Sequence, residues 1–262
     1  MSIKYDTIGI DYNQTRKADP YLTERHLHHL NPTTSGLYLE IGCGTGNYTD
    51  ALQQKEYSFI GIDPSNEMLD KAKQQNTQID WHLGQAEATG LKSESINGIV
   101  AHLTIHHWTD LEKAFAELDR VLVPNGKIVI FTATPEQMKG YWLEHYFPKM
   151  IKDSIDVMPS YERIETAMTP SNFSIVQTEK YFVKPDLKDQ FLYCGKFDPN
   201  FYFNEQIRRG ISSFSAISNA EEVKAGLDLM KRDMVSDKIK EVMKSYENDL
   251  GDYLYIVAQK KS

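Results

Sequence analysis

The order of hydrophobic and polar residues divides positions 37–133 into short apolar stretches and longer amphipathic ones. The apolar stretches are rich in β-branched side chains and predict buried strands. These strands are expected at Leu37–Ile41, Ser58–Ile62, Ile79–Leu83, Gly98–Leu103 and Lys127–Thr132. The stretches between them predict helices at Tyr48–Gln54, Asn66–Gln75 and Leu111–Leu122. In the last helix, apolar residues recur with the i, i+4, i+7 spacing of one buried face.

Strands that alternate with helices predict a doubly wound, mostly parallel sheet of the Rossmann-like α/β class. The turn Pro124–Gly126 is expected to stop the helix before it and to start the next strand. Ligands of such sheets bind at the carboxyl ends of the strands. Candidate site residues are therefore expected directly after each strand.

Outside residues 37–133 the pattern is looser. A helix is predicted at Tyr21–Leu30, and residues 136–168 are expected to be mainly helical. Two more strands are predicted at Phe173–Val183 and Tyr253–Gln259, and one amphipathic helix at Glu221–Tyr246.

These elements predict four segments. They are an N-terminal cap with the ligand-binding core at 1–134, a helical segment with the sixth strand at 135–184, an aromatic-rich helical lid or substrate insertion at 185–250, and the final strand of the core at 251–262. The insertion therefore comes before the last strand of the sheet.

Composition narrows the classes of function. Among the 262 residues, 40% are hydrophobic and 25% charged, and no apolar run approaches the roughly 20 residues of a membrane helix. The N-terminus lacks the pattern of a signal peptide. The two cysteines, Cys43 and Cys194, favour a reducing, cytoplasmic location over a disulfide framework. The net charge of −8 argues against a nucleic-acid partner, because phosphate backbones bind basic surfaces.

The first predicted strand runs into a glycine-rich turn, Gly42–Gly46, with an acid, Glu40, just before it. A strand, a glycine turn and a helix form a unit whose backbone approaches a ligand closely. The dinucleotide fingerprint is G-x-G-x-x-G, whereas here the third glycine comes one residue earlier. The Glu40 carboxylate repels phosphate but suits an ammonium group. The turn therefore predicts a nucleoside that carries an amino acid.

The second strand ends at an acid, Asp63, about twenty residues after the glycine turn. At this spacing a carboxylate accepts hydrogen bonds from the two hydroxyls of a ribose. Asp63 can instead cap the helix that begins at Asn66, with Ser65 as the alternative cap.

Polar side chains also follow the third and fourth strands. Gln85 or Glu87 can accept from the exocyclic amine of adenine, and a plain polar loop is the alternative. His106 and His107 either line the site, one of them as a general base, or are packed structural histidines. No metal site is expected, because zinc usually needs three or four spaced ligands and no cysteine lies nearby.

The motifs described so far are Leu39–Gly46, Gly61–Leu69, Gly84–Glu87, Ile105–Trp108 and Leu118–Lys127. In this order they resemble the class I S-adenosylmethionine-dependent methyltransferases. The most similar branch acts on small molecules and includes ubiquinone/menaquinone-type and antibiotic-pathway enzymes. Tyr5–Gly9, with Tyr12 and Arg16, resembles the N-terminal segment of bacterial members, which folds over the cofactor. Tyr12 and Arg16 would then hold the cofactor carboxylate, or else form an exposed turn and helix start.

The resemblance implies S-adenosylmethionine as the cofactor. The implied cofactor-binding residues are Tyr12, Arg16, Glu40, Gly42, Cys43, Gly44, Asp63, Pro64, Met68, Gln85, Ala86, Glu87, His102 and Leu103. Residues 42–44 would contact the methionyl part, and Glu40 would orient its ammonium through water. Asp63 would take the ribose hydroxyls, while Met68 would cover the adenine and Ala86 would offer its backbone to the ring.

At the end of the fourth strand, His102 and Leu103 would flank the sulfonium through backbone contacts. Family members often have an acid where Gln85 stands, so adenine recognition would move to Glu87 or to the backbone alone. Family members also often have an acid where Asn97 stands, at a position that is usually structural.

The implied reaction is methyl transfer to a small organic acceptor by in-line displacement, which depends mainly on alignment and exclusion of water. His106 and His107 are the candidate bases for an acceptor that must lose a proton. Aromatic residues between 191 and 214 would either contact an apolar acceptor or form the insertion's own core, and Arg208–Arg209 would either meet an anionic group or end a solvated helix.

Other functions remain open at this point. One is RNA methylation, which the acidic charge disfavours. Another is a non-catalytic S-adenosylmethionine-binding protein. A nicotinamide dehydrogenase is least supported, because of the glycine spacing and Glu40.

Overall fold

The structure is a computed structural model, and it describes residues 15–262. The chain forms two compact units. One, the sheet unit, contains Lys17–Thr132, Pro159–Glu179 and Leu254–Ser262. The other, the helical unit, contains Thr15, Arg16, Ala133–Met158 and Lys180–Tyr253.

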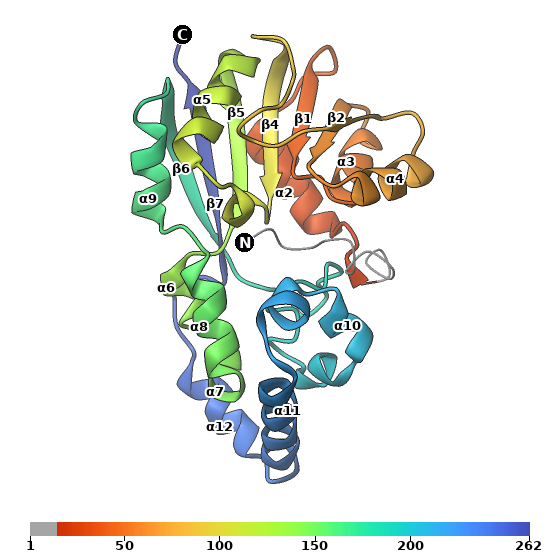
Figure 1. Ribbon diagram of the computed structural model, residues 1–262. Coiled ribbons are helices and arrows are strands. Elements are labelled where there is room, and N and C mark those ends of the chain that lie inside the picture. Colours follow the sequence, from red (N-terminus) through yellow and green to blue (C-terminus); the bar gives the residue numbers. More distant parts are fainter. Residues whose placement is uncertain (1–14) are drawn as a thin grey trace. The chain divides into compact units, whose positions relative to one another are not determined.

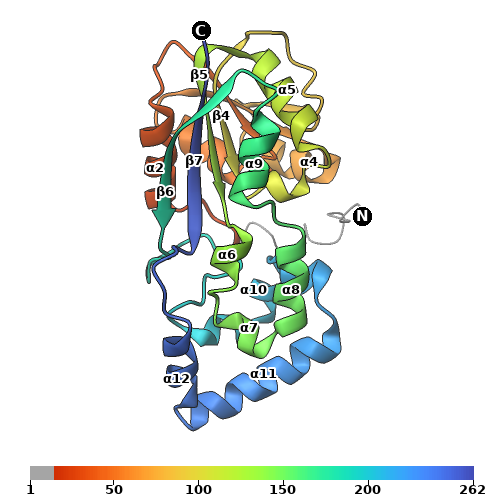
Figure 2. The same ribbon diagram turned by 90° about the vertical axis from the view of Figure 1, so that its left-hand side faces the viewer.

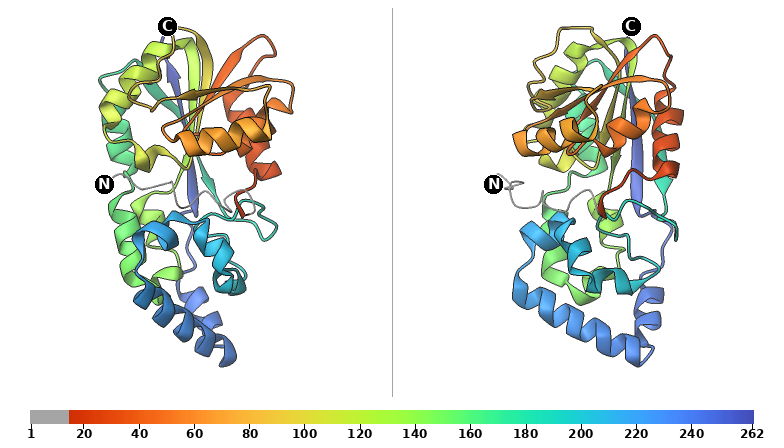
Figure 3. Two further views of the ribbon diagram at one scale, coloured as in Figure 1. Left: turned by 45° about the vertical axis from the view of Figure 1, so that its right-hand side comes forward. Right: turned by 90° about the vertical axis from the view of Figure 1, so that its right-hand side faces the viewer.

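The central element is a seven-stranded sheet with the order β3-β2-β1-β4-β5-β7-β6 (Figure 1). The strands are β1 (Leu37–Ile41), β2 (Ser58–Asp63), β3 (Asp80–Leu83), β4 (Ile96–His102), β5 (Leu122–Thr132), β6 (Phe173–Tyr181) and β7 (Tyr253–Lys260). The first five pair in parallel, whereas β7 runs antiparallel to β5. The C-terminal strand thus lies inside the sheet (Figure 3). The predicted fold class, with an insertion before the last strand, is confirmed.

Helices cover both faces of this sheet. In the sheet unit they are α2 (Pro20–Leu30), α3 (Asn47–Gln53), α4 (Asn66–Gln75), the 3-10 helix η3 (Ile105–His107), α5 (Leu111–Val121) and α9 (Tyr161–Met168). Figure 2 shows α2 on one face, and α5 with α9 on the other. A parallel sheet with two covered faces needs nearly continuous apolar strands, which explains the short apolar stretches of the sequence.

Helix α5 illustrates how the sequence pattern forms this core. Its N-cap is Asp110, whose carboxylate accepts from Lys113 N at 3.0 Å. Leu111, Phe115 and Leu118 are buried, as the predicted spacing requires. The helix ends at Val121, close to the predicted boundary.

The helical unit is built from short elements. They are α6 (Pro135–Met138), α7 (Leu143–Tyr146), α8 (Pro148–Asp156), the 3-10 helix η4 (Pro199–Phe203), α10 (Glu205–Arg209), the π-helix η5 (Ser213–Ile217), α11 (Ala220–Val235) and α12 (Lys238–Ser245). Aromatic rings fill its interior. Tyr141 and Tyr193 stack with ring centroids 4.0 Å apart, and Tyr202 and Phe214 are buried beside them in the unit.

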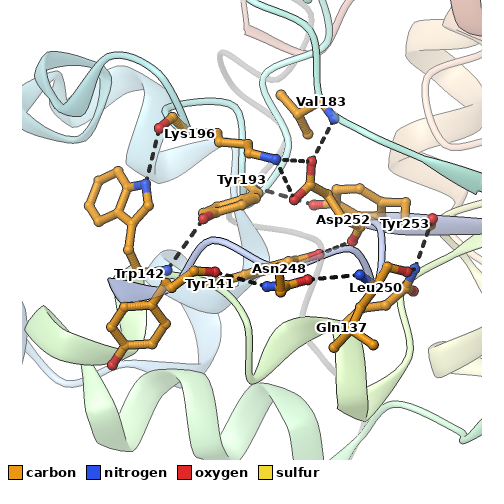
Figure 4. Close-up of polar contacts among 11 residues, drawn as sticks. Gln137, Tyr141, Trp142, Val183, Tyr193, Lys196, Asn248, Leu250, Asp252 and Tyr253 are labelled. Atoms are coloured by element: carbon orange, nitrogen blue, oxygen red, sulfur yellow. Dashed lines mark hydrogen bonds and ion pairs between the residues drawn. The ribbon is translucent and has the colours of Figure 1, made fainter. Parts of the chain in front are cut away.

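A buried carboxylate, Asp252, organises the polar contacts of the helical unit (Figure 4). Its two oxygens lie 2.9 and 2.7 Å from Lys196 Nζ, and Oδ2 also accepts from Val183 N at 2.7 Å. The hydroxyl of Tyr141 donates to the Asp252 carbonyl. A buried ion pair with further hydrogen bonds fixes the conformation of the segments that meet there.

Two sequence-based expectations need correction. The turn at Pro124–Gly126 does not separate α5 from the next strand, because β5 already begins at Leu122, which pairs with Ile96. The turn is instead an irregularity within the strand, with Asn125 at φ 65°. The helix predicted at Glu221–Tyr246 is two helices, α11 and α12, since Asp237 adopts φ 62° between them.

No helix within residues 15–262 is long and apolar enough to cross a membrane.

The C-terminal strand anchors α5 through a largely buried ammonium group. Lys260 Nζ donates to the carbonyls of Asp119 at 2.7 Å and Leu122 at 2.8 Å. Replacing Lys260 by Met should lower the free energy of unfolding by about 1–3 kcal/mol, because two carbonyls at a helix end lose a charged donor. Urea unfolding measures this loss. The matched variant Lys261→Met changes an exposed neighbour and should leave the urea midpoint of unfolding unchanged. An equal loss of unfolding free energy in both variants would contradict the anchoring role of Lys260.

Candidate functional site at the carboxyl ends of the parallel strands

The glycine-rich turn after β1 depends on left-handed backbone. Gly42, Gly44 and Gly46 have φ values of 71°, 55° and 80°. A Cβ on Gly42 would lie 2.0 Å from Thr104 Oγ1, whereas a Cβ on Gly44 would meet nothing within 4 Å. The turn is therefore packed against the end of β4 at Gly42 and borders open space at Gly44. Open space beside bare backbone is what close approach by a ligand requires.

Asp63 joins the end of β2 to this turn. Its Oδ2 accepts from Gly44 N at 2.8 Å, and its Oδ1 accepts from Ser65 N at 2.9 Å. Burial raises the pKa of this carboxyl, while the two N–H donors oppose that shift. The cap of α4 is Ser65, whose hydroxyl accepts from Met68 N at 3.3 Å. Of the two predicted caps, the structure thus selects Ser65 and places Asp63 against the glycine turn.

Glu40 is buried at the end of β1 and accepts a hydrogen bond from the hydroxyl of Thr49. Burial raises its pKa to about 8, even though the hydrogen bonds from Thr49 favour the charged form. A buried carboxyl of this kind gains from an ammonium partner, which would favour its ionised form.

The end of β4 carries an aromatic stack. The ring of His102 lies between Tyr48, with centroids 3.9 Å apart, and Phe131, with centroids 5.1 Å apart. His26 Nε2 on α2 is 2.9 Å from His102 Nδ1, so one imidazole donates to the other. Burial lowers the pKa of His26 well below its ordinary value, so the imidazole of His26 is neutral at pH 7.

Leu103 and Thr104 lead from this stack to η3. Leu103 has φ 50°, a conformation that β-carbon-bearing residues rarely adopt and that occurs often at functional sites. His106 and His107 follow, with ring centroids 3.9 Å apart, and both are half-buried. Burial lowers the pKa of His107 to about 4. The imidazole of His107 is therefore neutral at pH 7 and able to accept a proton.

The loop after β3 has a tight turn, in which Gln85 and Ala88 form an isolated bridge. Ala86 is buried and Gln85 is exposed. The carboxylate of Glu87 is engaged within the protein, accepting from Thr109 and Asp110. The predicted contact of Glu87 with adenine stays a prediction.

The remaining predicted residues lie in different settings. Met68 and Cys43 are buried, and Pro64 is exposed. Burial raises the pKa of the Cys43 thiol well above its ordinary value, so this cysteine is no nucleophile at pH 7. Arg16 belongs to the helical unit, where its Nε lies 2.5 Å from the buried carboxylate of Asp189.

Tyr12 and the segment Tyr5–Gly9 lie outside the described residues. The structure therefore brings together the predicted residues from Glu40 to His107 in the sheet unit. The cofactor roles of all these residues remain predictions.

Sequence reasoning missed His26, Trp81 and Glu117. Trp81 lies over the third glycine, since a Cβ on Gly46 would be 2.3 Å from its indole. The sequence offered one indication of His26, a polar residue on the face of α2 that packs against the sheet.

No group of three or more His, Cys, Asp or Glu residues in the described part of the chain is placed to hold a metal ion.

Comparison with known proteins matches residues 39–130 to a methyltransferase domain family. An uncharacterised methyltransferase from Schizosaccharomyces pombe is 35% identical over 129 residues, which are 48% of each chain. A probable S-adenosylmethionine-dependent methyltransferase from Saccharomyces cerevisiae is 26% identical over 161 residues, 55% of each chain. The chain thus spans about half the length of the curated relatives it matches.

Among solved structures, a putative methyltransferase from an antibiotic biosynthesis pathway of Anabaena variabilis aligns with 94% of this chain and 99% of its own. Its TM-score is 0.83 and its sequence identity is 29%. A geranyl diphosphate methyltransferase crystallised with sinefungin aligns with 91% of this chain and 76% of its own, at a TM-score of 0.57 and 15% identity, and so shares the fold.

The raised pKa of Glu40 predicts that the free energy of unfolding of the wild-type protein depends on pH, relative to a variant that lacks this carboxyl. The folded state holds the proton of this carboxyl up to about pH 8, whereas the unfolded chain releases it near pH 4.5. The unfolded state therefore binds fewer protons between these values, and stability falls as the pH rises. Relative to wild type, Glu40→Gln should become progressively more stable from pH 5 to pH 8 in urea unfolding.

The exposed Glu24→Gln serves as the control and should run parallel to wild type across this range. Parallel curves for Glu40→Gln as well would show that Glu40 is ionised in the folded protein.

Proposed function

We propose that this chain, a class I S-adenosylmethionine-dependent methyltransferase by its fold and domain match, transfers the methyl group of S-adenosylmethionine to a small organic acceptor. The observation that carries the proposal is the junction of Asp63 with Gly44 at the open side of the glycine turn. It places a carboxylate beside bare backbone at the carboxyl ends of β1 and β2, where ligands of such sheets bind.

The residues present fit this cofactor. Gly44 offers room for close approach, and Asp63 accepts the two ribose hydroxyls with oxygen lone pairs beyond those that its N–H donors use. Glu40 supplies a buried carboxyl for the ammonium group. Met68 and the backbone of Ala86 hold the adenine in this proposal.

When bound, S-adenosylmethionine supplies a methyl group activated by a sulfonium. The protein aligns the acceptor with that methyl and excludes water, so that a bimolecular displacement becomes effectively unimolecular. For an acceptor that must lose a proton, His107 is one candidate base; its imidazole is neutral at pH 7, but its lowered pKa makes it a weaker base than an ordinary histidine. His106 is the second candidate.

The side chains that recognise the acceptor stay a prediction. The aromatic residues Phe191, Tyr193, Tyr202 and Phe214 are buried within the helical unit and serve its core. Phe201 and Phe203 are half-buried, and Arg208 donates to the carbonyl of Tyr202 at 2.6 Å. Arg209 pairs with Glu205 on an exposed helix. Phe197 is exposed, and it stays a predicted candidate for acceptor contact together with Phe201, Phe203 and Arg208.

Two other functions remain as alternatives. RNA methylation is disfavoured by the net charge of −8, and a tRNA mobility-shift assay at low salt tests it. A non-catalytic cofactor-binding protein is tested by release of S-adenosylhomocysteine in the presence of candidate acceptors. A cytoplasmic location, expected from the cysteine content, stays a prediction.

Calorimetric titration with S-adenosylmethionine tests the proposal directly. We expect saturable one-site binding by the wild-type protein, and Asp63→Ala should weaken it by about 1–3 kcal/mol, because a charged acceptor of hydrogen bonds is lost. Absence of binding at millimolar ligand would refute the proposal.

The conservative variant Asp63→Asn separates two contributions. It keeps one carbonyl oxygen for Gly44 N and should retain the turn while losing part of the affinity for ribose. Unchanged affinity in both Asp63 variants would show that the ribose assignment is wrong.

A further inference from the structure

The loop after β3, residues 84–91, is fastened to the segment around α5 by two carboxylates. The first is Glu87, which is 6% exposed. Its Oε1 accepts from Thr109 N at 2.6 Å, from Thr109 Oγ1 at 2.9 Å and from Asp110 N at 3.1 Å. One oxygen of a loop residue thus collects three donors from two consecutive residues that follow β4.

The second carboxylate belongs to α5 itself. Glu117 Oε1 accepts from Thr89 N at 2.9 Å and from Thr89 Oγ1 at 2.6 Å. Arg120 holds Glu117 in place and also donates to the carbonyl of Leu91 at 2.7 Å. Burial raises the pKa of Glu117, but the hydrogen bonds from Arg120 and Thr89 lower it to about 2. Glu117 is therefore ionised at neutral pH.

The two carboxylates act at different places: Glu117 on α5 binds Thr89 in the loop after β3, and Glu87 in that loop binds the residues at the start of α5. Glu117 reaches the loop from the body of α5, about 1.7 turns after the start of the helix. Glu87 holds Thr109 and Asp110, which come directly after His106, His107 and Trp108. Asp110 is also the N-cap of α5. The position at which η3 ends and α5 begins is therefore set by a side chain of the loop after β3.

We infer that Glu87 is a positioning residue, which couples the loop proposed to bind adenine to the segment that carries His106 and His107. This inference rests on the proposed function for the identity of the ligand. It assigns Glu87 to the link between cofactor recognition and the candidate base rather than to a contact with the adenine amine.

The chemistry of the contact supports this role. A buried carboxylate is costly unless its charge is matched by hydrogen bonds, and three donors on one oxygen supply that match. An amide oxygen at the same place has two lone pairs and no charge, so Glu87→Gln preserves part of the link. Glu87→Ala removes the link and leaves the N–H groups of Thr109 and Asp110 and the hydroxyl of Thr109 without this acceptor.

The experiment compares four variants with the wild-type protein. Glu87→Ala removes the link and Glu87→Gln weakens it. Thr109→Val deletes one donor at an exposed position. Glu112→Gln is the matched control on α5, where an exposed ion pair with Arg163 is lost. Calorimetry with S-adenosylhomocysteine measures the dissociation constant. NMR of the histidine ring protons between about pH 3 and pH 8 measures the titration of His107, assigned through His107→Gln.

We expect Glu87→Ala to raise the dissociation constant about tenfold, which corresponds to about 1.4 kcal/mol. In the same variant without ligand, the titration midpoint of His107 should move from about 4 toward the ordinary 6.5, because the loosened segment admits water. Glu87→Gln and Thr109→Val should show both effects to a smaller extent. Glu112→Gln should show neither.

A further variant separates coupling from general loosening of the loop. Glu117→Gln acts on the same loop through Thr89 and not through Thr109. It should weaken ligand binding while leaving the midpoint of His107 in place. If Glu87→Ala weakens binding with an unchanged His107 midpoint, or changes neither quantity, the coupling is refuted.

The two measurements keep this inference distinct from the proposed function. If the wild-type protein binds no S-adenosylhomocysteine, the proposed function fails, and the titration of His107 alone decides the link. If Glu87→Ala does not fold, Thr109→Val and Glu87→Gln decide it: a shifted His107 midpoint in both supports the link, and the wild-type midpoint in both overturns it.

Discussion

The pairing of Asp63 with the backbone N–H groups of Gly44 and Ser65 is the contact on which the candidate site depends. It joins the turn after β1 to the turn after β2, although the two residues that meet are 19 positions apart. The left-handed φ of Gly44 aims its N–H at the carboxylate, and burial makes each of these hydrogen bonds stronger than it would be in water.

Acidic side chains hold the other loops of this edge in a similar way. Glu40 holds the first turn of α3 through Thr49, Glu87 holds the start of α5 through Thr109, and Glu117 holds the loop after β3. Each accepts hydrogen bonds from a hydroxyl and from a backbone N–H group. Loops at the end of a parallel sheet have few backbone partners of their own, so side-chain acceptors determine their conformation.

The helical unit also satisfies its buried polar groups with side-chain hydrogen bonds and an ion pair. Asp252 and Lys196 form an ion pair beside the ring of Tyr193, and Gln137 donates to the carbonyls of Leu250 and Tyr253 (Figure 4). Short helices cannot bury much apolar surface each, so rings and these fixed contacts together stabilise the unit. Most of its aromatic residues are therefore occupied by packing, and few remain to recognise an acceptor.

The sequence by itself determined the strands and helices of residues 37–133, the mostly parallel class of the sheet and the glycine turn, because each depends on a local period or on a conformation that only glycine adopts easily. It left Asp63 with two roles, and only the fold showed which neighbour it meets. The partners of Glu87 and of His26 lie 22 and 76 residues away, and no local pattern encodes such a meeting. The break between α11 and α12 escaped the pattern as well, since it depends on one left-handed residue, Asp237, inside a continuous amphipathic stretch. Local periodicity fixed the elements; the tertiary structure decided which side chains meet, because hydrogen-bond partners are set by the packing of segments that are distant in the chain.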